Sequence, residues 1–583
     1  MQLLSLVLTA AFGAPAPADA PATYAGPDGR SALRAWTFDG RAVTIPHVAN
    51  AALPGTRAAY AAFRGARGTY RTTVRTEPGT YVLRFESVAA RAEVEVDGHR
   101  VAAHQRAYEP FEARMQLDGG EHEVVVRADW RSPAAQTRLG LHRTWFNWGG
   151  INREVTLRRV DDSEITGVAL TTRVRGDSAR VALAVRVQNN LDVARPVPVL
   201  ARLVRRGRAR LYDLGTVELG PGEARTLERT VVVPRPDLWR PGLGALYQLQ
   251  VVVPFESGYR ARVGLRELSW RGGVLRVNGR PTVLRGASLH EDVPQRGDAL
   301  TIADMRDAVR QLRAIGANAT RAQHPLAPAL LERLDRAGIA VWQQIGPVDS
   351  PGKWRARTPA LLAQAREDVR EDLRAGRLHP AIVAWSLGCE VAGNGEPGQG
   401  AFVDAAAREL HAADPDRAVA VDVWTDHVPA VPGLLYRSLD AVGVTSYIGW
   451  YEQPRAPMRA QAALLRERVS ALRARFPGKA VVVAELGAEG TPDSPAARPG
   501  GRAYQARLLG AQLGGLRNAT GLSGVFVWVL RDFAVNPAFR GGTATRVFPS
   551  YRAVSGLNQK GLFDYAGRAK PAAAAVRRAF TRP

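Results

Sequence analysis

The stretch AIVAWSLGCE, residues 381–390, is an apolar run rich in Ile, Val and Trp that ends on a carboxylate. A buried parallel strand has this continuous hydrophobic character, and a charged residue at its carboxyl end lies where barrel folds build their active sites. Glu390 is therefore a catalytic candidate, and the alternative is a Glu that caps the following loop. A second apolar run, KAVVVAEL at 479–486, also places a carboxylate, Glu485, at its end. Two carboxylates at the carboxyl ends of two strands of one sheet form a candidate catalytic pair.

The chain around these two strands alternates strand-like segments with amphipathic helices from about residue 266 to residue 583. Eight strand–helix units in this length predict a (β/α)₈ barrel. The predicted strands are 280–287, 317–323, 339–345, 381–390, 418–424, 441–447, 479–486 and 524–530. The predicted helices are 301–316, 326–338, 358–376, 401–413, 457–475, 502–518 and 569–580, with a short helix at LLYRSL. Glu390 then ends the fourth strand and Glu485 ends the seventh, so we expect both side chains to face the same open end of the barrel.

The first part of the chain has the pattern of β-sheet. Between about 24 and 160, segments such as AEVEVDGHRV alternate apolar and polar residues between Gly, Pro and Asp turns, which predicts a jelly-roll β-sandwich. A second β series, 161–265, has the length of one immunoglobulin-like sandwich and the role of a spacer. The segment HRTWFNWGGINREV (142–155) holds three aromatics that either close the end of the first sandwich or stack on a sugar. The predicted fold class is multidomain: jelly roll, immunoglobulin-like sandwich and barrel.

Residues 1–20 resemble a signal peptide. They run MQLLSLVLTAAFGAPAPADA, an apolar segment followed by small residues and an A-x-A-like site, although no positive charge precedes the apolar part. We expect a secreted or periplasmic protein; the alternative is a plain apolar tail on a cytoplasmic one. No other stretch approaches the ~20 apolar residues of a membrane span, so we expect no membrane partner. The single cysteine, Cys389, excludes an internal disulfide framework.

The net charge of +24 would ordinarily suggest nucleic acid or an anionic surface. The excess is arginine spread evenly through the chain, and there is no basic run of the kind a nucleic-acid arm shows. We therefore expect no nucleic-acid partner, and attraction for anionic polymers is the weaker alternative. His290, Glu291 and Asp292 suggest metal ligands, but no other His or Cys cluster has ligand spacing, which favours a hydrogen-bond network without metal. The sequence leaves the oligomeric state open, and a homo-oligomer is compatible with it.

Two carboxylates facing one cleft suit glycoside hydrolysis, in which one protonates the leaving oxygen and the other attacks or activates water. A separation of about 5–5.5 Å gives retention through a covalent glycosyl-enzyme, and a wider gap gives inversion. The two pKa values must differ, so that one group is protonated while the other is ionised. Arg321, on the predicted second strand, can hold the nucleophile ionised.

These motifs resemble glycoside hydrolase family 2, the retaining family of β-galactosidases, β-mannosidases and β-glucuronidases. WSLGCE is similar to the family's W-S-x-x-N-E motif, which implies that Glu390 is the general acid/base, and AELGAEG (484–490) is similar to its nucleophile motif, which implies Glu485. RGASLHED (285–292) and TRAQHP (320–325) are similar to the motifs on the first two strands. The resemblance implies that Arg321 and His324 line the site and that no cofactor is needed.

Within the family the chain is most similar to the β-glucuronidase subgroup. ELGAE, SYIGWY (446–451) and WVLRDF (528–533) are similar to its nucleophile context, tyrosine loop and eighth strand. NQKG (558–561) is similar to the N-x-K-G motif whose amide and ammonium bind the sugar carboxylate, and such groups form charge-assisted hydrogen bonds to a uronate. The alternative for this lysine is a solvated loop residue. The resemblance implies that Tyr447 would hydrogen-bond the nucleophile. Trp528 is either a platform on which the sugar stacks or a core residue. The other implied substrate contacts are Tyr451, Asn558 and Lys560.

Three positions depart from the family pattern, and an Arg expected shortly before the N-x-K-G motif is not evident. Cys389 replaces the Asn that normally holds the sugar 2-hydroxyl, an interaction that strengthens in the transition state, and a thiol is a weaker donor. Thr144 stands for an Asp of the jelly-roll segment and Thr445 for the Asn of the tyrosine loop. We predict a retaining exo-β-glycosidase acting on β-glucuronides or a related uronide. The alternatives are β-galactosidase or β-mannosidase specificity, or a catalytically weakened carbohydrate-binding homologue.

Overall fold

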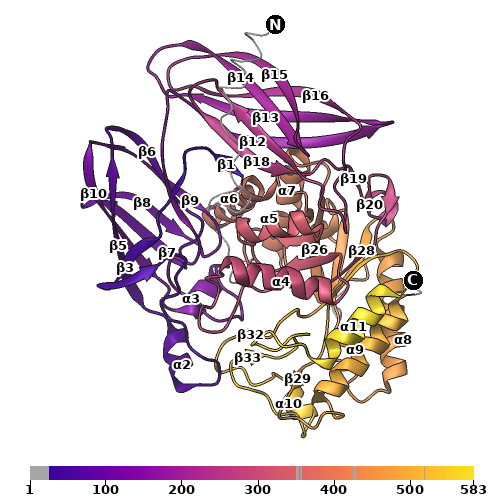
Figure 1. The fold of residues 1–583 in the computed structure, drawn as a ribbon. Helices are drawn as coiled ribbons and strands as arrows, with labels where there is room; N and C mark the ends of the chain where they lie inside the picture. The colour runs from indigo at the N-terminus through magenta and orange to yellow at the C-terminus, as the bar shows by residue number, and fades with distance from the viewer. Residues whose placement is uncertain (1–24, 349–353, 355–357, 425–428, 518, 583) are drawn as a thin grey trace.

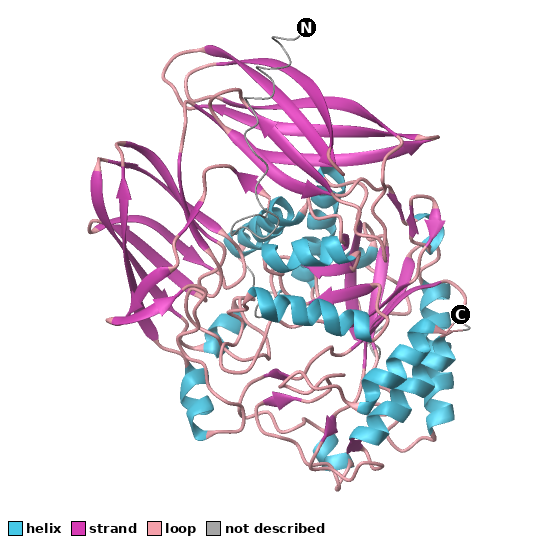
Figure 2. Cartoon of the chain, in the orientation of Figure 1, coloured by secondary structure: helices cyan, strands magenta, loops and turns pink. Residues whose placement is uncertain are grey.

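The fold is described from a computed structural model over residues 25–348, 354, 358–424, 429–517 and 519–582. The first β-sandwich lies at the left of Figure 1 and the second at the top, on two different sides of a barrel whose outer helices surround it (Figure 1; Figure 2). The predicted multidomain fold class is therefore confirmed. The predicted signal peptide, residues 1–20, lies outside the described residues.

The barrel is closed by eight parallel strands, each paired with the next and the last with the first. They are β22 (Leu284–Ser288), β23 (Ala319–Ala322), β24 (Ala340–Gln344), β25 (Ile382–Ser386), β26 (Ala418–Trp424), β27 (Ala441–Thr445), β28 (Ala480–Leu486) and β31 (Leu522–Val527). Nearly every residue of these strands is buried, which is why they read as continuous apolar runs in the sequence. All eight predicted strands are present.

Helices connect the barrel strands in the predicted alternation. They are α4 (Ile302–Ala314), α5 (Pro328–Ala337), α6 (Pro359–Gly376), α7 (Pro397–Ala413), the 3₁₀ turn η4 (Leu434–Tyr436), α8 (Met458–Arg475), α9 (Arg502–Leu516) and α11 (Pro571–Thr581). Thr301 begins α4 with a full capping box, its hydroxyl accepting from the Asp304 amide and the Asp304 carboxylate accepting in return. Helices α8, α9 and α11 lie side by side in the lower right of Figure 1.

Two predicted strand boundaries are wrong by four residues, and the eighth strand, predicted at 524–530, is observed at Leu522–Val527. The first barrel strand begins at Leu284 rather than residue 280, because Arg280–Pro281 (β21) pairs instead in a small sheet with β20 (Arg276–Val277) and β19 (Leu268–Ser269), and proline lacks the N–H that a central strand needs. The fourth strand ends at Ser386, four residues before Glu390. The intervening chain still follows β26, with the Leu387 amide donating to Ala420 at 2.8 Å.

The first sandwich consists of a six-stranded and a four-stranded antiparallel sheet that share one apolar core. The larger sheet has the order β4 (Arg41–Thr44), β3 (Ala35–Phe38), β5 (Arg67–Thr76), β10 (Gly120–Asp129), β7 (Arg91–Val96) and β8 (His99–Gln105). The smaller has the order β2 (Ser31–Ala32), β11 (Val155–Arg159), β6 (Gly79–Phe85) and β9 (Phe111–Leu117), and the short helices α2 (Arg57–Arg64) and α3 (Pro133–Arg138) lie in the connections.

The second sandwich pairs a three-stranded with a five-stranded sheet around a core of Val, Leu and Ala. The sheets are β12 (Ser163–Arg175), β13 (Ser178–Asn189) and β16 (Ala224–Pro234), and β1 (Gly26–Pro27), β18 (Gly258–Val263), β17 (Tyr247–Val252), β14 (Arg195–Arg205) and β15 (Arg208–Leu219). Strand β1 comes from the amino-terminal end yet pairs with β18, so the chain crosses the second sandwich before it enters the first.

Buried hydrogen bonds join the sandwiches to the barrel. The Arg106 guanidinium of the first sandwich lies 2.5 Å from the Asp368 carboxylate of α6. The Trp239 indole of the second donates to the Asp335 carbonyl of α5 at 2.8 Å. Within the described part of the chain, no helix is long and apolar enough to span a membrane.

Asp335 is a buried carboxylate that ties α5 to the start of β25. Its Oδ1 accepts from the Ala381 amide at 2.8 Å, and its Oδ2 lies 2.6 Å from His379 Nδ1. We expect Asp335→Ala to lower the free energy of unfolding by about 2–4 kcal/mol, because it leaves buried donors without an acceptor. Asp307→Ala, which removes an exposed carboxylate paired with Arg310, should change it by less than about 0.5 kcal/mol. Urea denaturation followed by tryptophan fluorescence measures the free energy of unfolding of both variants. Equal losses in Asp335→Ala and Asp307→Ala would contradict the structural role given to Asp335.

Candidate active site

A cavity of about 500 Å³ opens at the carboxyl ends of the barrel strands. Both predicted catalytic carboxylates line it. The side chains around it come from several barrel loops and from the first sandwich: Arg143, Thr144, Gln323, Glu390, Trp424, Tyr447, Tyr451, Glu485, Trp528, Asn558 and Lys560, with residues of the 535–539 loop. The pairing of carboxylates expected from the two strand ends is therefore present in three dimensions.

Glu485 lies near the end of β28 and is held by donors on both carboxylate oxygens. Its Oε1 accepts from Arg321 Nη1 at 2.9 Å and from Gln323 Nε2 at 3.0 Å. Its Oε2 accepts from the Tyr447 hydroxyl at 2.5 Å. Burial and the neighbouring Glu485 charge raise the pKa of Tyr447, so its hydroxyl stays protonated and donates. The arrangement fixes the orientation of a carboxylate facing the cavity.

Arg321 connects this carboxylate to the barrel interior. The side chain is 1% exposed, and Nη2 lies 2.7 Å from Asp422 Oδ2 on β26. Burial alone would lower the pKa of Arg321, but the carboxylates of Asp422 and Glu485 outweigh it and raise the pKa. One buried guanidinium thus faces two carboxylates.

Glu390 has a different environment. Its Oε2 accepts from Arg143 Nη2 at 2.7 Å, and its side chain is 26% exposed. Burial and the negative charge of Glu485 raise the pKa of Glu390 to about 7, against the opposing charges of Arg143 and Arg321. Its φ of 53° lies in the left-handed region, a strained conformation for a residue with a side chain and one that recurs at functional sites. A carboxyl group of this kind can be protonated near neutral pH.

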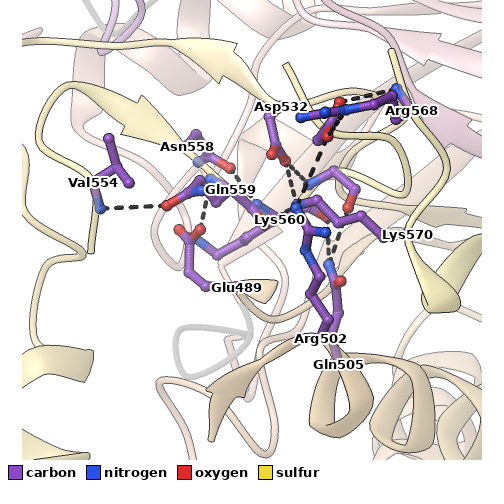
Figure 3. A network of polar contacts seen from close by, with 12 residues as sticks. Glu489, Arg502, Gln505, Asp532, Val554, Asn558, Gln559, Lys560, Arg568 and Lys570 are labelled. Carbon is purple, nitrogen blue, oxygen red and sulfur yellow. Dashed lines mark hydrogen bonds and ion pairs between the residues drawn. The ribbon is translucent and has the colours of Figure 1, made fainter. Parts of the chain in front are cut away.

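Lys560 and Asn558 also line the cavity, and Figure 3 shows them within one network of polar contacts. Lys560 is 2% exposed, and its Nζ donates to Glu489 Oε1 at 2.9 Å and to the Tyr451 hydroxyl at 3.0 Å. Burial opposes the ammonium charge, but Glu489 and Tyr451 raise the pKa of Lys560, so the group is charged. The Asn558 Oδ1 accepts from the Lys560 amide at 3.2 Å; across the described residues, its Nδ2 has no hydrogen-bond partner.

The loop that carries these two residues is fixed by buried polar contacts (Figure 3). The Gln559 amide donates to Glu489 Oε2 at 2.6 Å, and Gln505 on α9 donates to the Lys560 carbonyl at 3.1 Å. Beside it, Lys570 forms a second buried pair with Asp532 at 2.7 Å. The lysine is therefore held in place before any ligand binds.

The remaining predicted residues take different positions. His324 is not among the residues that line the cavity: its ring stacks on Tyr108 with ring centres 4.3 Å apart and packs against Trp145. Cys389 lies behind Glu485, where its Sγ is 2.9 Å from Gln323 Nε2 and burial raises the pKa of the thiol. Trp528 lines the cavity, and its ring also packs edge-on against His290.

Sequence reasoning missed several residues of this site, among them Gln323, Arg143 and Glu489. Gln323 directly follows β23, two positions after Arg321, and this spacing in an extended chain places both side chains on one face. Glu489 lies inside the quoted AELGAEG segment, but nothing in that segment indicates that it pairs with Lys560. Arg143 belongs to a sandwich remote in sequence, and no local pattern marks it.

The residues predicted as alternative metal ligands have protein partners instead. Glu291 Oε2 accepts from Arg153 at 2.8 Å, and Asp292 Oδ2 accepts from the Ala534 amide at 2.5 Å. The described ranges contain no group of three or more His, Cys, Asp or Glu side chains that could hold a metal ion.

A second cavity, of about 480 Å³, lies between the first sandwich and α4. Neither Glu390 nor Glu485 lines it.

Residues 268–490 match the family model "Glycosyl hydrolases family 2, TIM barrel domain", a range that contains both cavity carboxylates. The barrel of this chain thus matches the barrel domain of glycosyl hydrolase family 2. The β-glucuronidase of Paenibacillus borealis is 28% identical over 542 residues, which cover 85% of this chain and 84% of that protein.

Solved structures with bound uronic acids share the fold. The β-galacturonidase from Eisenbergiella tayi bound to galacturonate matches with a TM-score of 0.82 at 22% identity, covering 96% of this chain and 98% of that one. The β-glucuronidase of Ruminococcus gnavus in complex with D-glucuronic acid matches with a TM-score of 0.78 at 19% identity, covering 95% and 98%. The two-sandwich and barrel arrangement is thus shared with enzymes whose structures hold uronic acids.

The bridge made by Arg321 predicts a large stability effect. We expect Arg321→Met to lower the free energy of unfolding by about 3–5 kcal/mol, because it leaves the buried Asp422 and Glu485 carboxylates facing each other without a cation. Tyr447→Phe removes one neutral donor from the same carboxylate and should cost only about 1–2 kcal/mol. Differential scanning calorimetry of the two variants checks the order, and an Arg321→Met loss no larger than that of Tyr447→Phe would contradict it.

Proposed function

We propose that this protein is a retaining exo-β-glycosidase that hydrolyses terminal β-linked uronides, either glucuronides or galacturonides. The observation that carries the proposal is one cavity lined by two carboxylates in unlike environments and by a buried ammonium with an adjacent amide. The similarity to a β-glucuronidase and to structures bound to uronic acids supports the same substrate class.

In the proposed first step, Glu390 protonates the glycosidic oxygen while a carboxylate oxygen of Glu485 attacks the anomeric carbon. The bond to the leaving group breaks, and a covalent glycosyl-enzyme forms. Glu390, now ionised, then takes a proton from water, which attacks the anomeric carbon and releases Glu485. The pKa of about 7 for Glu390 suits a group that must both give and take a proton near neutral pH.

Recognition of the sugar carboxylate is assigned to Lys560 and Asn558. An ammonium has three N–H donors, and two of them point to Glu489 and Tyr451, which leaves one for a ligand. The Asn558 oxygen is occupied by the Lys560 amide, so its NH₂ group is the part available to the cavity. Two donors, one of them charged, suit a carboxylate better than a primary hydroxyl.

The substrate class is tested with matched aryl β-glucuronide, β-galacturonide, β-galactoside and β-mannoside substrates. Lys560→Ala alone would strand the buried Glu489 charge, so the informative variant is the double change Lys560→Met with Glu489→Gln. We expect kcat/KM for the preferred uronide to fall about 10–150-fold, the worth of a charged hydrogen bond, with no comparable loss for a neutral glycoside.

The matched control is Lys570→Met with Asp532→Asn, which removes the neighbouring buried pair outside the cavity. It should preserve the preference for uronides. Turnover of a neutral sugar that the Lys560 and Glu489 changes leave intact would assign β-galactosidase or β-mannosidase specificity instead. Ligand binding without turnover would favour the weakened carbohydrate-binding homologue.

The stereochemical outcome is a separate prediction. Because the donors around Glu485 orient it as a nucleophile, we expect the sugar to be released first as the β-anomer. Proton NMR of the anomeric signals during the first minutes of hydrolysis measures this directly. Initial release of the α-anomer would show inversion and would remove the covalent intermediate from the mechanism.

A further inference from the structure

We propose that Arg143, supplied by the first sandwich, is a positioning residue that orients Glu390 and favours its ionised form. The inference rests on the proposed function, since it assigns Glu390 as the acid/base. Of the described residues, Arg143 is the one whose side chain forms an ion pair with Glu390, through Nη2 and Oε2 at 2.7 Å. The catalytic carboxyl of the barrel is thereby coupled to a domain that precedes it by more than two hundred residues.

The segment that carries Arg143 is fixed against the barrel. The Asn536 amide donates to the Thr144 carbonyl at 3.1 Å, and the Phe146 amide donates to the Ala534 carbonyl at 3.0 Å, so residues 144–146 pair antiparallel with 534–536. The Trp145 ring packs against His290 and His324, with ring centres 5.4 and 5.9 Å away. His324, which the sequence analysis placed in the site, therefore anchors the segment beside it.

The charge of Arg143 can act on the ionisation of Glu390 because the two side chains are close and partly buried. Its side chain is 13% exposed and that of Glu390 is 26% exposed, so the pair is only partly screened by water. Burial and Glu485 disfavour the charged form of Glu390, and Arg143 is the opposing cation in direct contact. The charged or titratable groups that face Glu390 come from several elements: Arg143, Arg321 on β23, Cys389, Tyr447 after β27 and Glu485 on β28.

Arg321 does not substitute for Arg143 in this role. Its guanidinium is committed to Asp422 and Glu485, at 2.7 and 2.9 Å. When Arg143 is removed, Glu390 is still buried and still repelled by the Glu485 charge, but it no longer has a cation in direct contact. An acid in this situation binds its proton more tightly, so it should remain a competent general acid at higher pH.

The test is the pH dependence of kcat/KM for Arg143→Gln and Arg143→Met, the second of which keeps the aliphatic stem at the interface. The basic limb of this profile reports the acid of the free enzyme. We expect both charge-free variants to move that limb upward by about 1 pH unit, and Arg143→Lys to keep it close to that of the parent. The maximal kcat should fall because Glu390 loses its fixed orientation.

The control is Arg106→Gln, which removes another buried arginine between the first sandwich and the barrel, one that contacts Asp368 and not Glu390. We expect this change to lower thermal stability but to leave the basic limb in place. A limb that stays within about 0.2 pH units of the parent in both Arg143→Gln and Arg143→Met would overturn the inference. An equal shift in Arg106→Gln would overturn it as well, since domain docking would then account for the effect.

A direct titration separates this inference from the proposed function. The carboxyl ¹³C signal of Glu390, identified by its loss in Glu390→Gln, is followed against pH in the parent and in Arg143→Met. If no glycoside is hydrolysed, the proposed function fails, yet an upward shift of the Glu390 titration in Arg143→Met still supports the inference. An unchanged titration overturns it whether or not the protein is active.

Discussion

The ion pair between Arg321 and Glu485 is the interaction on which the candidate site depends. A buried guanidinium needs a counter-charge, and here it faces Asp422 on one side and Glu485 on the other. Because the cation stands on the second barrel strand and the two carboxylates on the fifth and seventh, the pairing also joins separate parts of the barrel wall. The same contacts that stabilise the barrel interior orient one carboxylate toward the cavity.

The two cavity carboxylates differ through their surroundings and not through their residue type. Glu485 receives donors from Arg321, Gln323 and Tyr447, which complement an ionised group. Among the residues that the structure describes, Arg143 is the one cation in direct contact with Glu390, and the charge of Glu485 adds to burial in raising the pKa of Glu390 to about 7. The positive charge of the nearby Lys560 is balanced by the buried Glu489 carboxylate. The cavity therefore offers a ligand carboxylate a charged donor whose own charge is already paired. These separate charge balances let the proposed general acid, the proposed nucleophile and the proposed anion-binding donor lie within one cavity of about 500 Å³.

Much of this architecture could be predicted from the sequence because the informative patterns are local. The eight barrel strands are short apolar runs between amphipathic helices; Glu390 follows one of them and Glu485 lies near the end of another. The first and fourth strand boundaries were wrong because Pro281 and the irregular chain after Ser386 depend on pairing that a single segment does not reveal. The partners of the site residues could not be predicted either: Glu489 against Lys560 and Arg143 against Glu390 are contacts between distant segments. Sequence reasoning identified His324 but not its packing against the aromatic rings of the first sandwich.

The central claim, that Glu485 forms a covalent bond to a uronosyl group, is tested most directly by trapping that intermediate. The protein is incubated with a 2-deoxy-2-fluoro-β-uronosyl fluoride of the preferred sugar, digested, and analysed by tandem mass spectrometry. The account predicts one uronosyl adduct per chain, on the Glu485 side chain, with loss of activity in proportion to labelling. An adduct on Glu390 or on another residue, or complete inactivation without any adduct, would contradict it.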